Sequence, residues 1–566
     1  MLAVRNIVIE LISAVLCGVA IGLAMAITAN AFVEAAVYAN EYRNSLPWLE
    51  VNFGSSTYSL SSIFSLLLAA LLITWLRKWL NISHWQGPAD SIYAAHSEDP
   101  TIETSKGLGS TLAAFIVISG GGSVGQYGPL VHFGSTIGLF IKKYFRVQMT
   151  PDIFIGCGVA AAISAGFNAP LAGVIFAHEA ILRHFSLRAI APIFIASISA
   201  SAFDEYFFGA TQNLFDLSQN IPPLNDILPM FIALGPLFAI IAVIFMYSLR
   251  TASLFAARAG NYSSLLPFLA ALICGSVGVI FPEILGLGVE PINELIAGNI
   301  SSGKVMFLLI AKISMTALCI GFGLFGGVFS PALFIGVAAG SLAAAVISTF
   351  GYEGAEQVII ISGMAAVGAS VIGAPLSSVL IVLELTGSYD YAVAAMIAVI
   401  ISTLVTYRIF GLSFFDRQLL DRGVDMRLGR ELIALGQRSV TICSQSDYVQ
   451  LDSETTGDTA FKLMKEAGMV ESYIVNKDGE YKGKLDIFGA IAASSNSVLD
   501  FVVNEPITLY ESDSLQAAMM KTVDFVGESI PILSADEKYL RAVVSEGNIF
   551  QAVIDIQNTA SKIGRA

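Results

Sequence analysis

The chain has 566 residues, of which 55% are hydrophobic and only 13% are charged. This composition is too apolar for a soluble globular protein of such length, so we expect a multi-pass protein embedded in a lipid bilayer. The formal net charge of −14 argues against nucleic acid as a partner, because nucleic acids are bound by basic surfaces. The five cysteines are scattered without a paired motif, which argues against a disulfide framework and against a metal site.

The apolar segments vary in length along the chain. The first, Ile7–Ala29, is too long for the core of a signal peptide, so we interpret it as a retained membrane helix. The second, Leu60–Leu76, is followed by Arg77 and Lys78, and positive residues favour the cytoplasmic side. Apolar segments then continue almost without a break over residues 108–411, and several are short and interrupted by glycine. This pattern predicts tilted or half-spanning helices rather than a simple bundle.

A glycine-rich stretch, Gly120–Pro129, leads directly into the apolar run Leu130–Ile141. Proline is favourable in the first turn of a helix, and glycines leave backbone amides accessible. A helix N-terminus carries partial positive charge and unpaired N–H donors, so it can bind an anion. Broken helices at membrane depth mark the binding site in many transporters. The stretch therefore predicts an anion site inside the membrane.

The membrane part contains an internal repeat. Asn168–Glu179 is similar to Gly373–Glu384, and Gly125–Pro129 is similar to Gly327–Pro331. The two pairs occur in the same order and at nearly the same spacing in the chain. We interpret them as two homologous halves, at about 60–220 and 260–415, each supplying a broken helix to a central site, as in many transporters.

The composition changes beyond the membrane part, where charged residues return and apolar runs shorten. We expect a linker over residues 423–445 and a soluble α/β domain over residues 446–566. Two similar units are predicted there, with strands at Ser472–Val475 and Ile530–Leu533. On the cytoplasmic side, this domain would be a candidate regulatory module.

Together these features resemble the CLC family of chloride channels and chloride/proton exchangers. Gly125–Pro129 looks like the family's G-[KR]-E-G-P motif, and Gly326–Pro331 looks like its G-G-x-F-x-P motif. Phe167–Phe176 and Gly373–Leu376 are similar to its two x-A-P-L helices, and the C-terminal domain resembles a pair of CBS domains. The resemblance implies a polytopic all-α membrane domain over residues 1–422, built as an inverted repeat of tilted, partly half-spanning helices. It also implies a cytoplasmic α/β CBS pair.

The resemblance further implies a homodimer in a bacterial inner (plasma) membrane, with one chloride pathway in each subunit. It places the inner loop at Gln86 and Gly87, and aligns the family's inner tyrosine with Phe415. The implied anion-binding residues are Gln86, Gly87, Gly128, Val328, Phe329 and Phe415.

Two departures from the family pattern concern proton coupling. The gating glutamate of the family aligns with Tyr127, and the proton-pathway glutamate of exchangers aligns with Ala180. A phenol remains neutral at pH 7, so it could block or line the path but could not readily shuttle protons. We therefore predict passive, proton-uncoupled transport of chloride or a similar small anion, with Tyr127 as the gate.

Four other functions compete with this prediction. A sodium- or proton-coupled organic solute transporter with a similar inverted repeat would need unwound carbonyl cages and a roomier pocket, and the sequence alone does not exclude it. A chloride/proton antiporter could use a non-standard internal route through Glu179 and His178, although a helix cap and a packed histidine are the simpler interpretations. A CBS-regulated cation transporter would need carboxylates along its pore, and the apolar segments contain few. A membrane-anchored enzyme is disfavoured, because the chain shows no nucleophile–base pair, nucleotide-binding loop or metal-ligand cluster.

The CBS-like domain also departs from the nucleotide-binding pattern, which places an aspartate three residues after a serine or threonine. Here Asn548 follows Ser545, and Gly489 follows Asp486. We therefore expect a structural role for this domain in preference to adenine-nucleotide binding, and no bound cofactor.

Overall fold

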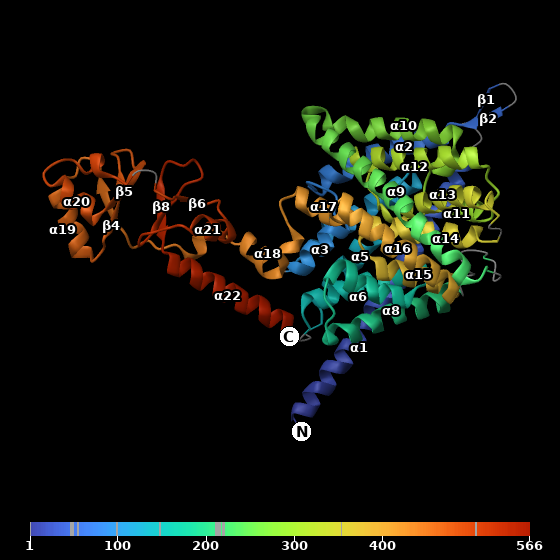
Figure 1. The fold of residues 1–566 in the computed structure, drawn as a ribbon, viewed down its shortest axis with the longest axis horizontal. Helices are drawn as coiled ribbons and strands as arrows, with labels where there is room; N and C mark the ends of the chain where they lie inside the picture. Colours follow the sequence, from blue (N-terminus) through green and yellow to red (C-terminus); the bar gives the residue numbers. More distant parts are fainter. Residues whose placement is uncertain are drawn as a thin grey trace. The chain divides into compact units, whose positions relative to one another are not determined.

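The computed structural model describes residues 2–45, 50–53, 56–97, 100–145, 149–209, 217, 221–351, 354–503 and 506–565. The chain divides into two compact units, Met1–Gly423 and Val424–Ala566 (Figure 1). The first unit is mostly helical, and the second combines helices with two small sheets.

In chain order, the long helix α9 stands between the helices of the first half of this unit and those of the second half. The helices are α1 (Leu2–Asn44), α2 (Ser61–Trp79), α3 (Pro88–His96), α4 (Thr104–Ser119), α5 (Tyr127–Lys142), α6 (Pro151–Phe167), α7 (Pro170–Phe176), α8 (Leu187–Phe208), α9 (Leu224–Arg258), α10 (Leu266–Ile280), α11 (Val289–Ile296), α12 (Ser302–Gly321), α13 (Phe329–Ser348), α14 (Glu356–Ile372), α15 (Pro375–Thr386), α16 (Tyr389–Ile409) and α17 (Phe414–Asp421). Eight helical segments in the described ranges are long and apolar enough to span a membrane.

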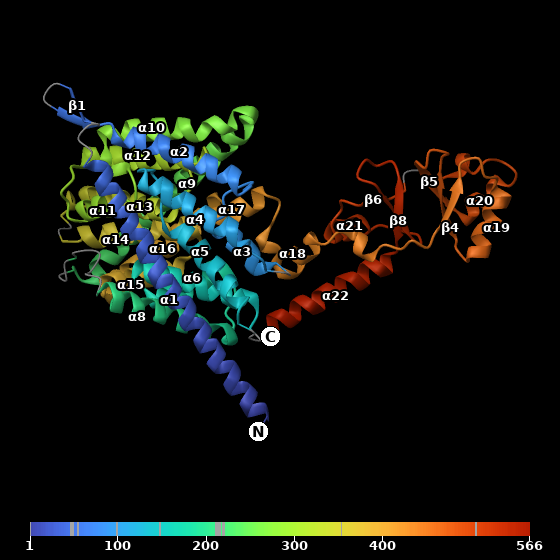
Figure 2. The ribbon, with the colours of Figure 1, turned by 180° about the vertical axis from the view of Figure 1, so that it is seen from behind.

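Several elements differ from the sequence-based expectation. Helix α1 runs on far beyond Ala29, and it crosses α4, α5, α6 and α8 (Figure 2). An antiparallel strand pair, β1 (Glu50–Phe53) and β2 (Ser56–Ser59), interrupts the otherwise helical unit. Helix α7 ends at Phe176 and continues as a π-helix, Ala177–Leu182, which local propensity does not predict.

The two halves of the repeat fold alike. In one half α5 packs on α6, and in the other α13 packs on α14. Helix α6 ends at Asn168 in the left-handed conformation (φ 49°), and α14 ends at Gly373 in the same conformation (φ 78°). Each stop is followed by a helix that begins with proline, at Pro170 and Pro375. Proline pre-sets the backbone of a first helical turn, so each half restarts its chain as a short, separate helix.

The second unit contains two copies of one βαββα arrangement. The first copy comprises β3 (Val449–Asp452), α19 (Gly457–Ala467), β4 (Glu471–Val475), β5 (Tyr481–Asp486) and α20 (Ile487–Ala493). The second comprises β6 (Leu509–Tyr510), α21 (Leu515–Lys521), β7 (Ile530–Leu533), β8 (Leu540–Val544) and α22 (Glu546–Arg565). In each copy the central strand pairs parallel to the first strand and antiparallel to the third. Each copy encloses its own apolar core.

The segment expected to be a linker, residues 423–445, is largely helical. It contains α18 (Gly429–Gln437), which packs on α21 and α22 inside the second unit. Its buried residues Leu435 and Val440 belong to the core of the second copy, so this segment is part of that unit.

Candidate anion pathway

The glycine loops of the two halves are joined directly to each other. Gly125 donates to the carbonyl of Gly327 at 2.7 Å, and Gly327 donates to the carbonyl of Gly125 at 2.6 Å. A Cβ atom at Gly128 would lie 3.0 Å from the Cα of Gly327, so no side chain fits between the loops without displacement. The paired loops bring the starts of α5 and α13 together.

Both helices begin with amides that have no partner inside the helix. The first helical bonds are donated by Leu130 and Ala332, each at 3.0 Å. The amides just before them stay outside the helical ladder. They are the N–H groups of Tyr127, Gly128, Phe329 and Ser330. Val328 is the residue that caps α13. The arrangement offers N–H donors and the positive ends of two helix dipoles at one place, which suits a small anion.

Tyr127 lies in a cluster of three aromatic rings. Its ring stacks on Phe167 with a centroid distance of 3.7 Å, and it meets Phe329 edge-on at 5.7 Å. Phe167 and Phe329 are 5.3 Å apart, and Tyr127 is only 7% exposed. Gly166 makes room for this packing, because a Cβ there would lie 3.0 Å from the Tyr127 ring. The sequence analysis named Phe167 as part of a motif and not as a site residue. Its contact with Tyr127 is known only from the fold.

A cavity of about 30 Å³ borders this cluster. Its lining includes Tyr127, Phe167, Gln126 and Ser330. The side-chain oxygens of Gln126 and Ser330 are buried and lack a hydrogen-bond partner among the described residues. A space of this size holds about one or two water molecules, and the two oxygens can bond to such an occupant.

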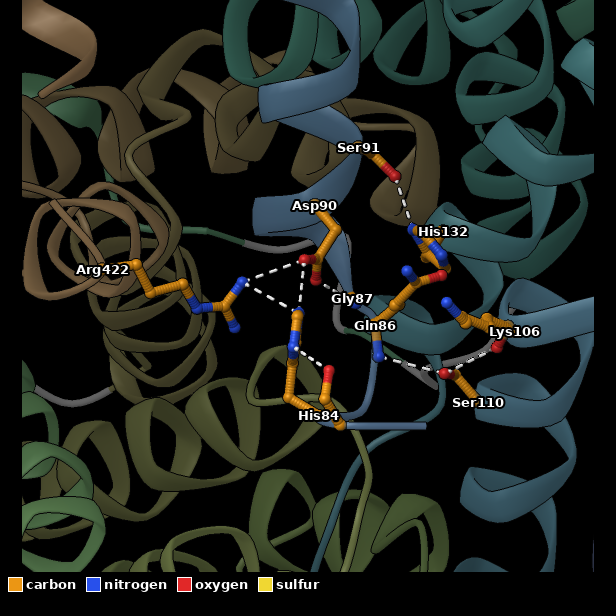
Figure 3. Close-up of polar contacts among 10 residues, drawn as sticks. His84, Gln86, Gly87, Asp90, Ser91, Lys106, Ser110, His132 and Arg422 are labelled. Atoms are coloured by element: carbon orange, nitrogen blue, oxygen red, sulfur yellow. Dashed lines mark hydrogen bonds and ion pairs between the residues drawn. The ribbon is translucent and has the colours of Figure 1, made fainter. Parts of the chain in front are cut away.

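The inner loop is organised by residues that the sequence analysis did not single out. The amide of Gly87 donates to Asp90 Oδ2 at 2.8 Å, and the amide of Gln86 donates to Ser110 Oγ at 3.0 Å. The Gln86 side chain points toward His132 of α5 (Figure 3), and its Oε1 has no partner in the described part of the chain. His132 Nδ1 lies 2.9 Å from Ser91 Oγ. The expected role of Gln86 in binding an anion therefore remains a prediction.

Phe415 is buried in the first turn of α17, on a different element from the Tyr127 cluster. Ion pairs hold this short helix to distant elements. Asp416 pairs with Arg183, and Asp421 accepts two bonds from Arg250 of α9, both at 2.9 Å. The position of Phe415 is thus set by contacts around α17.

Glu179 caps the helix α15 of the other half. Its carboxylate accepts the amide N–H groups of Leu376 and Ser377 at 2.9 and 2.8 Å, and the Ser377 hydroxyl at 2.6 Å. Glu384 makes the corresponding contacts with the first turn of α7, at 2.8 Å each. The two carboxylates thus cap each other's helices reciprocally.

His178 precedes this cap in the π-helix. Its Nδ1 donates to the carbonyl of His184 at 2.8 Å, and its ring stacks on Phe185 at 5.0 Å. Its Nε2 is buried and has no partner in the described ranges. Beside it, Ala180 offers no titratable group.

The capping role of Glu179 makes a testable prediction. Glu179→Gln should lower the stability of the protein by about 1–2 kcal/mol, because a neutral amide accepts helix N–H bonds less strongly than a carboxylate. Thermal unfolding in detergent would measure this loss, and Glu384→Gln is the matched control that should lose a similar amount. If Glu179→Gln alone altered proton movement during chloride flux, Glu179 would be more than a cap.

Lys312 is a candidate pathway residue that the sequence analysis missed. It lies in α12, is fully buried, donates to the carbonyl of Ile284 at 2.9 Å and sits 5.1 Å from the ring centre of Phe334. Among the described residues no carboxylate pairs with it. A lysine inside an apolar helix is the available sequence signal, because intramembrane charges are rare and functional. Since Phe334 belongs to α13, Lys312 lies against one of the two helices whose N-termini meet at the paired glycine loops.

Residues 69–407 match the family described as "Voltage gated chloride channel". The chain is 30% identical over 362 residues to the H(+)/Cl(-) exchange transporter ClcA of Yersinia pseudotuberculosis, covering 62% of this chain and 72% of the relative. It is 31% identical over 346 residues to the transporter of the same name from Citrobacter koseri, covering 59% and 71%.

Two solved structures share the fold. The crystal structure of a slow cyanobacterial Cl-/H+ antiporter matches with a TM-score of 0.64 at 21% identity, over 73% of this chain and 98% of that chain. A eukaryotic CLC transporter matches with a TM-score of 0.61 at 18% identity, over 95% of this chain and 98% of that chain. The second match extends into the C-terminal unit, whose two βαββα copies resemble a CBS pair.

Proposed function

Because the chain belongs to the CLC family of chloride channels and transporters, we propose that it conducts chloride or a similar small anion passively, without coupling to protons. The protein is a multi-pass membrane protein of anion transport, and neither an enzyme nor a cation transporter. We also propose that the protein forms a homodimer with one pathway per subunit, in a bacterial inner membrane, with its second unit in the cytoplasm.

The observation that carries the proposal is Tyr127 at the start of α5. It occupies the family's gate position, and its ring is held between Phe167 and Phe329. A phenol neither competes as an anion nor exchanges protons near neutral pH. The paired glycine loops contain no carboxylate that could replace it.

The inner proton site supports the same conclusion. Ala180 cannot carry a proton, and the neighbouring Glu179 is engaged at the N-terminus of α15 by three hydrogen bonds. The named relatives are proton/chloride exchangers, so exchange is the second candidate function. His178 favours that candidate, because it is a titratable residue beside Glu179 and its Nε2 has no hydrogen-bond partner among the described residues.

We assign the anion-binding role to the backbone at Gly128, Val328 and Phe329, where the two helix N-termini meet. Gln86 and Gly87 would form the inner end of the pathway, and the buried ring of Phe415 would narrow it there. The roles of Gly128, Val328 and Phe329 rest on the geometry of the paired loops. The roles of Gln86, Gly87 and Phe415 rest on the family resemblance.

We further propose a structural role for the C-terminal unit. Asp486 and Ser545, which stand where a nucleotide-binding pattern begins, act as helix caps. Asp486 accepts the amide of Gly489 at 2.6 Å, and Ser545 accepts the amide of Asn548 at 3.2 Å. These two side chains therefore stabilise helix N-termini inside the unit, which supports a structural role.

The deciding experiment uses purified full-length protein in chloride-loaded liposomes. Chloride efflux and external pH are recorded together, with and without a potassium ionophore. We expect ionophore-dependent chloride flux without uphill proton movement. Proton uptake driven by a chloride gradient would overturn the uncoupled mechanism, and His178→Gln would then test the alternative route.

A further inference from the structure

One carboxylate connects three segments at the inner loop (Figure 3). Asp90 Oδ1 lies 3.1 Å from His84 Nε2 and 2.9 Å from Arg422 Nη1, while Oδ2 accepts the Gly87 amide. Arg422 directly follows α17, the helix that carries Phe415. Asp90 therefore ties the end of α17 to the inner loop and to the first turn of α3.

The two side chains that bond to Asp90, those of His84 and Arg422, are close enough to compete for it. Arg422 Nη1 lies only 3.5 Å from His84 Nε2, and both face the same carboxylate oxygen. A neutral His84 can donate from Nε2 to Asp90 while Nδ1, 3.3 Å from Ser83 Oγ, accepts from that hydroxyl. A proton added at Nδ1 then places a full positive charge beside the guanidinium. The side chain of Arg422 is 38% exposed, so it is free to turn into solvent.

The other charged groups near His84 have partners of their own. Arg77 of α2 donates to the carbonyls of Ile82 and Ser83. In α4, Lys106 pairs with Glu103 at 2.7 Å. His132 of α5 is 1% exposed and bonded to Ser91.

Asp90 itself stays ionised over the pH range in which histidines titrate. Burial raises the pKa of its carboxyl, but the hydrogen bond from His84 and the charge of Arg422 outweigh burial and lower that pKa to about 2. The imidazole of the cluster belongs to His84, whose side chain is 51% exposed and therefore open to protons from solvent.

We propose that the contacts of Asp90 with His84 and Arg422 form a pH-sensitive link between the inner loop and the end of α17. We call this link the tie. Protonation of His84 draws Asp90 away from Arg422, releases the inner loop from the residue that follows α17, and increases anion flux past Phe415. This inference rests on the proposed anion conduction, because it describes the regulation of that pathway. In it, the three residues are positioning residues and do not bind the transported anion.

The test is chloride efflux from liposomes at symmetric pH 7.5 and 5.5. We expect wild-type flux to rise by roughly fivefold or more at pH 5.5, a typical size for coupling between two sites. His84→Gln keeps an N–H donor for Asp90 without a titratable charge, so its flux should not change with pH. Arg422→Gln lacks the tie, so its flux at pH 7.5 should already equal the wild-type flux at pH 5.5.

His184→Gln is the matched control, because His184 is another exposed histidine, 43% exposed and 3.7 Å from Asp152. It should respond to pH like the wild type. A pH response that survives in His84→Gln, or is lost in His184→Gln, would contradict the tie. Wild-type flux that does not change with pH would also contradict the tie alone, whereas absence of chloride flux at both pH values would contradict the proposed function.

A second readout does not depend on transport. The chain has five histidines, so the imidazole NMR signal of His84 can be assigned by its loss in His84→Gln. Arg422→Gln should move the titration of that signal to higher pH, because a neighbouring cation is removed. An unchanged titration would show that His84 and Arg422 are not coupled.

Discussion

Replacing Tyr127 by alanine should increase chloride flux by about tenfold or more. The ring stacks on Phe167 at 3.7 Å and borders a cavity of about 30 Å³, so its removal joins that cavity to the space it occupied. A barrier lowered by only about 1.4 kcal/mol gives a tenfold rate increase. Chloride efflux from liposomes with a potassium ionophore would measure the change.

The matched control is Tyr127→Phe, which preserves the stacked ring and removes only the hydroxyl. It should conduct like the wild type if the ring is the obstruction. Equal acceleration in both variants would identify the hydroxyl as the barrier. An alanine variant that elutes as a folded protein and conducts at the wild-type rate would remove Tyr127 from the gate.

Replacing Lys312 by methionine should reduce chloride flux by about tenfold or more. The ammonium group is fully buried and lies against α13 without a carboxylate partner among the described residues. For an assumed separation of about 10 Å and an effective dielectric constant of about 20, Coulomb's law gives roughly 1.7 kcal/mol between the ammonium and an anion, which is more than tenfold in anion affinity. Initial efflux rates at several chloride concentrations would measure the loss.

Stability separates an electrostatic role of Lys312 from a structural one. Burying an ammonium group is costly, so Lys312→Met should leave the unfolding temperature unchanged or raised while flux falls. Lys312→Arg keeps the positive charge and should keep most of the flux. Normal flux in Lys312→Met would show that this cation does not act on the anion.

The parts of the fold that follow from local patterns were predictable from sequence. The starts of α5 and α13 follow from Pro129 and Pro331, because proline in a first helical turn is a local signal. Strand β7 covers the residues expected from its apolar pattern, Ile530–Leu533. The family resemblance, confirmed by the comparisons, gave the membrane architecture and the CBS-like tail.

The contacts that organise the pathway were not predictable in the same way. Each glycine loop is visible in the sequence, but the pairing of Gly125 with Gly327 that joins the two loops is not. In the sequence, Asp90 is one acidic residue in a polar stretch, and its contact with Arg422 is known only from the fold. The charge of Lys312 within an apolar segment is visible in the sequence, but its burial and its position against Phe334 are known only from the fold. These features depend on distant residues meeting, and sequence periodicity carries no information on such meetings.

The hydrogen-bonded glycine loops have a consequence for how such a protein can change over evolutionary time. Their geometry depends on main-chain atoms and on the absence of side chains at Gly125, Gly128 and Gly327. Substitutions at Gln126 and Tyr127 can therefore change the side chains there and leave the main-chain pairing of the two loops intact. In the proposed pathway, selection can act on the side chain at the gate position separately from the backbone that would bind the anion. Conducting and exchanging descendants can thus arise from one scaffold by few substitutions.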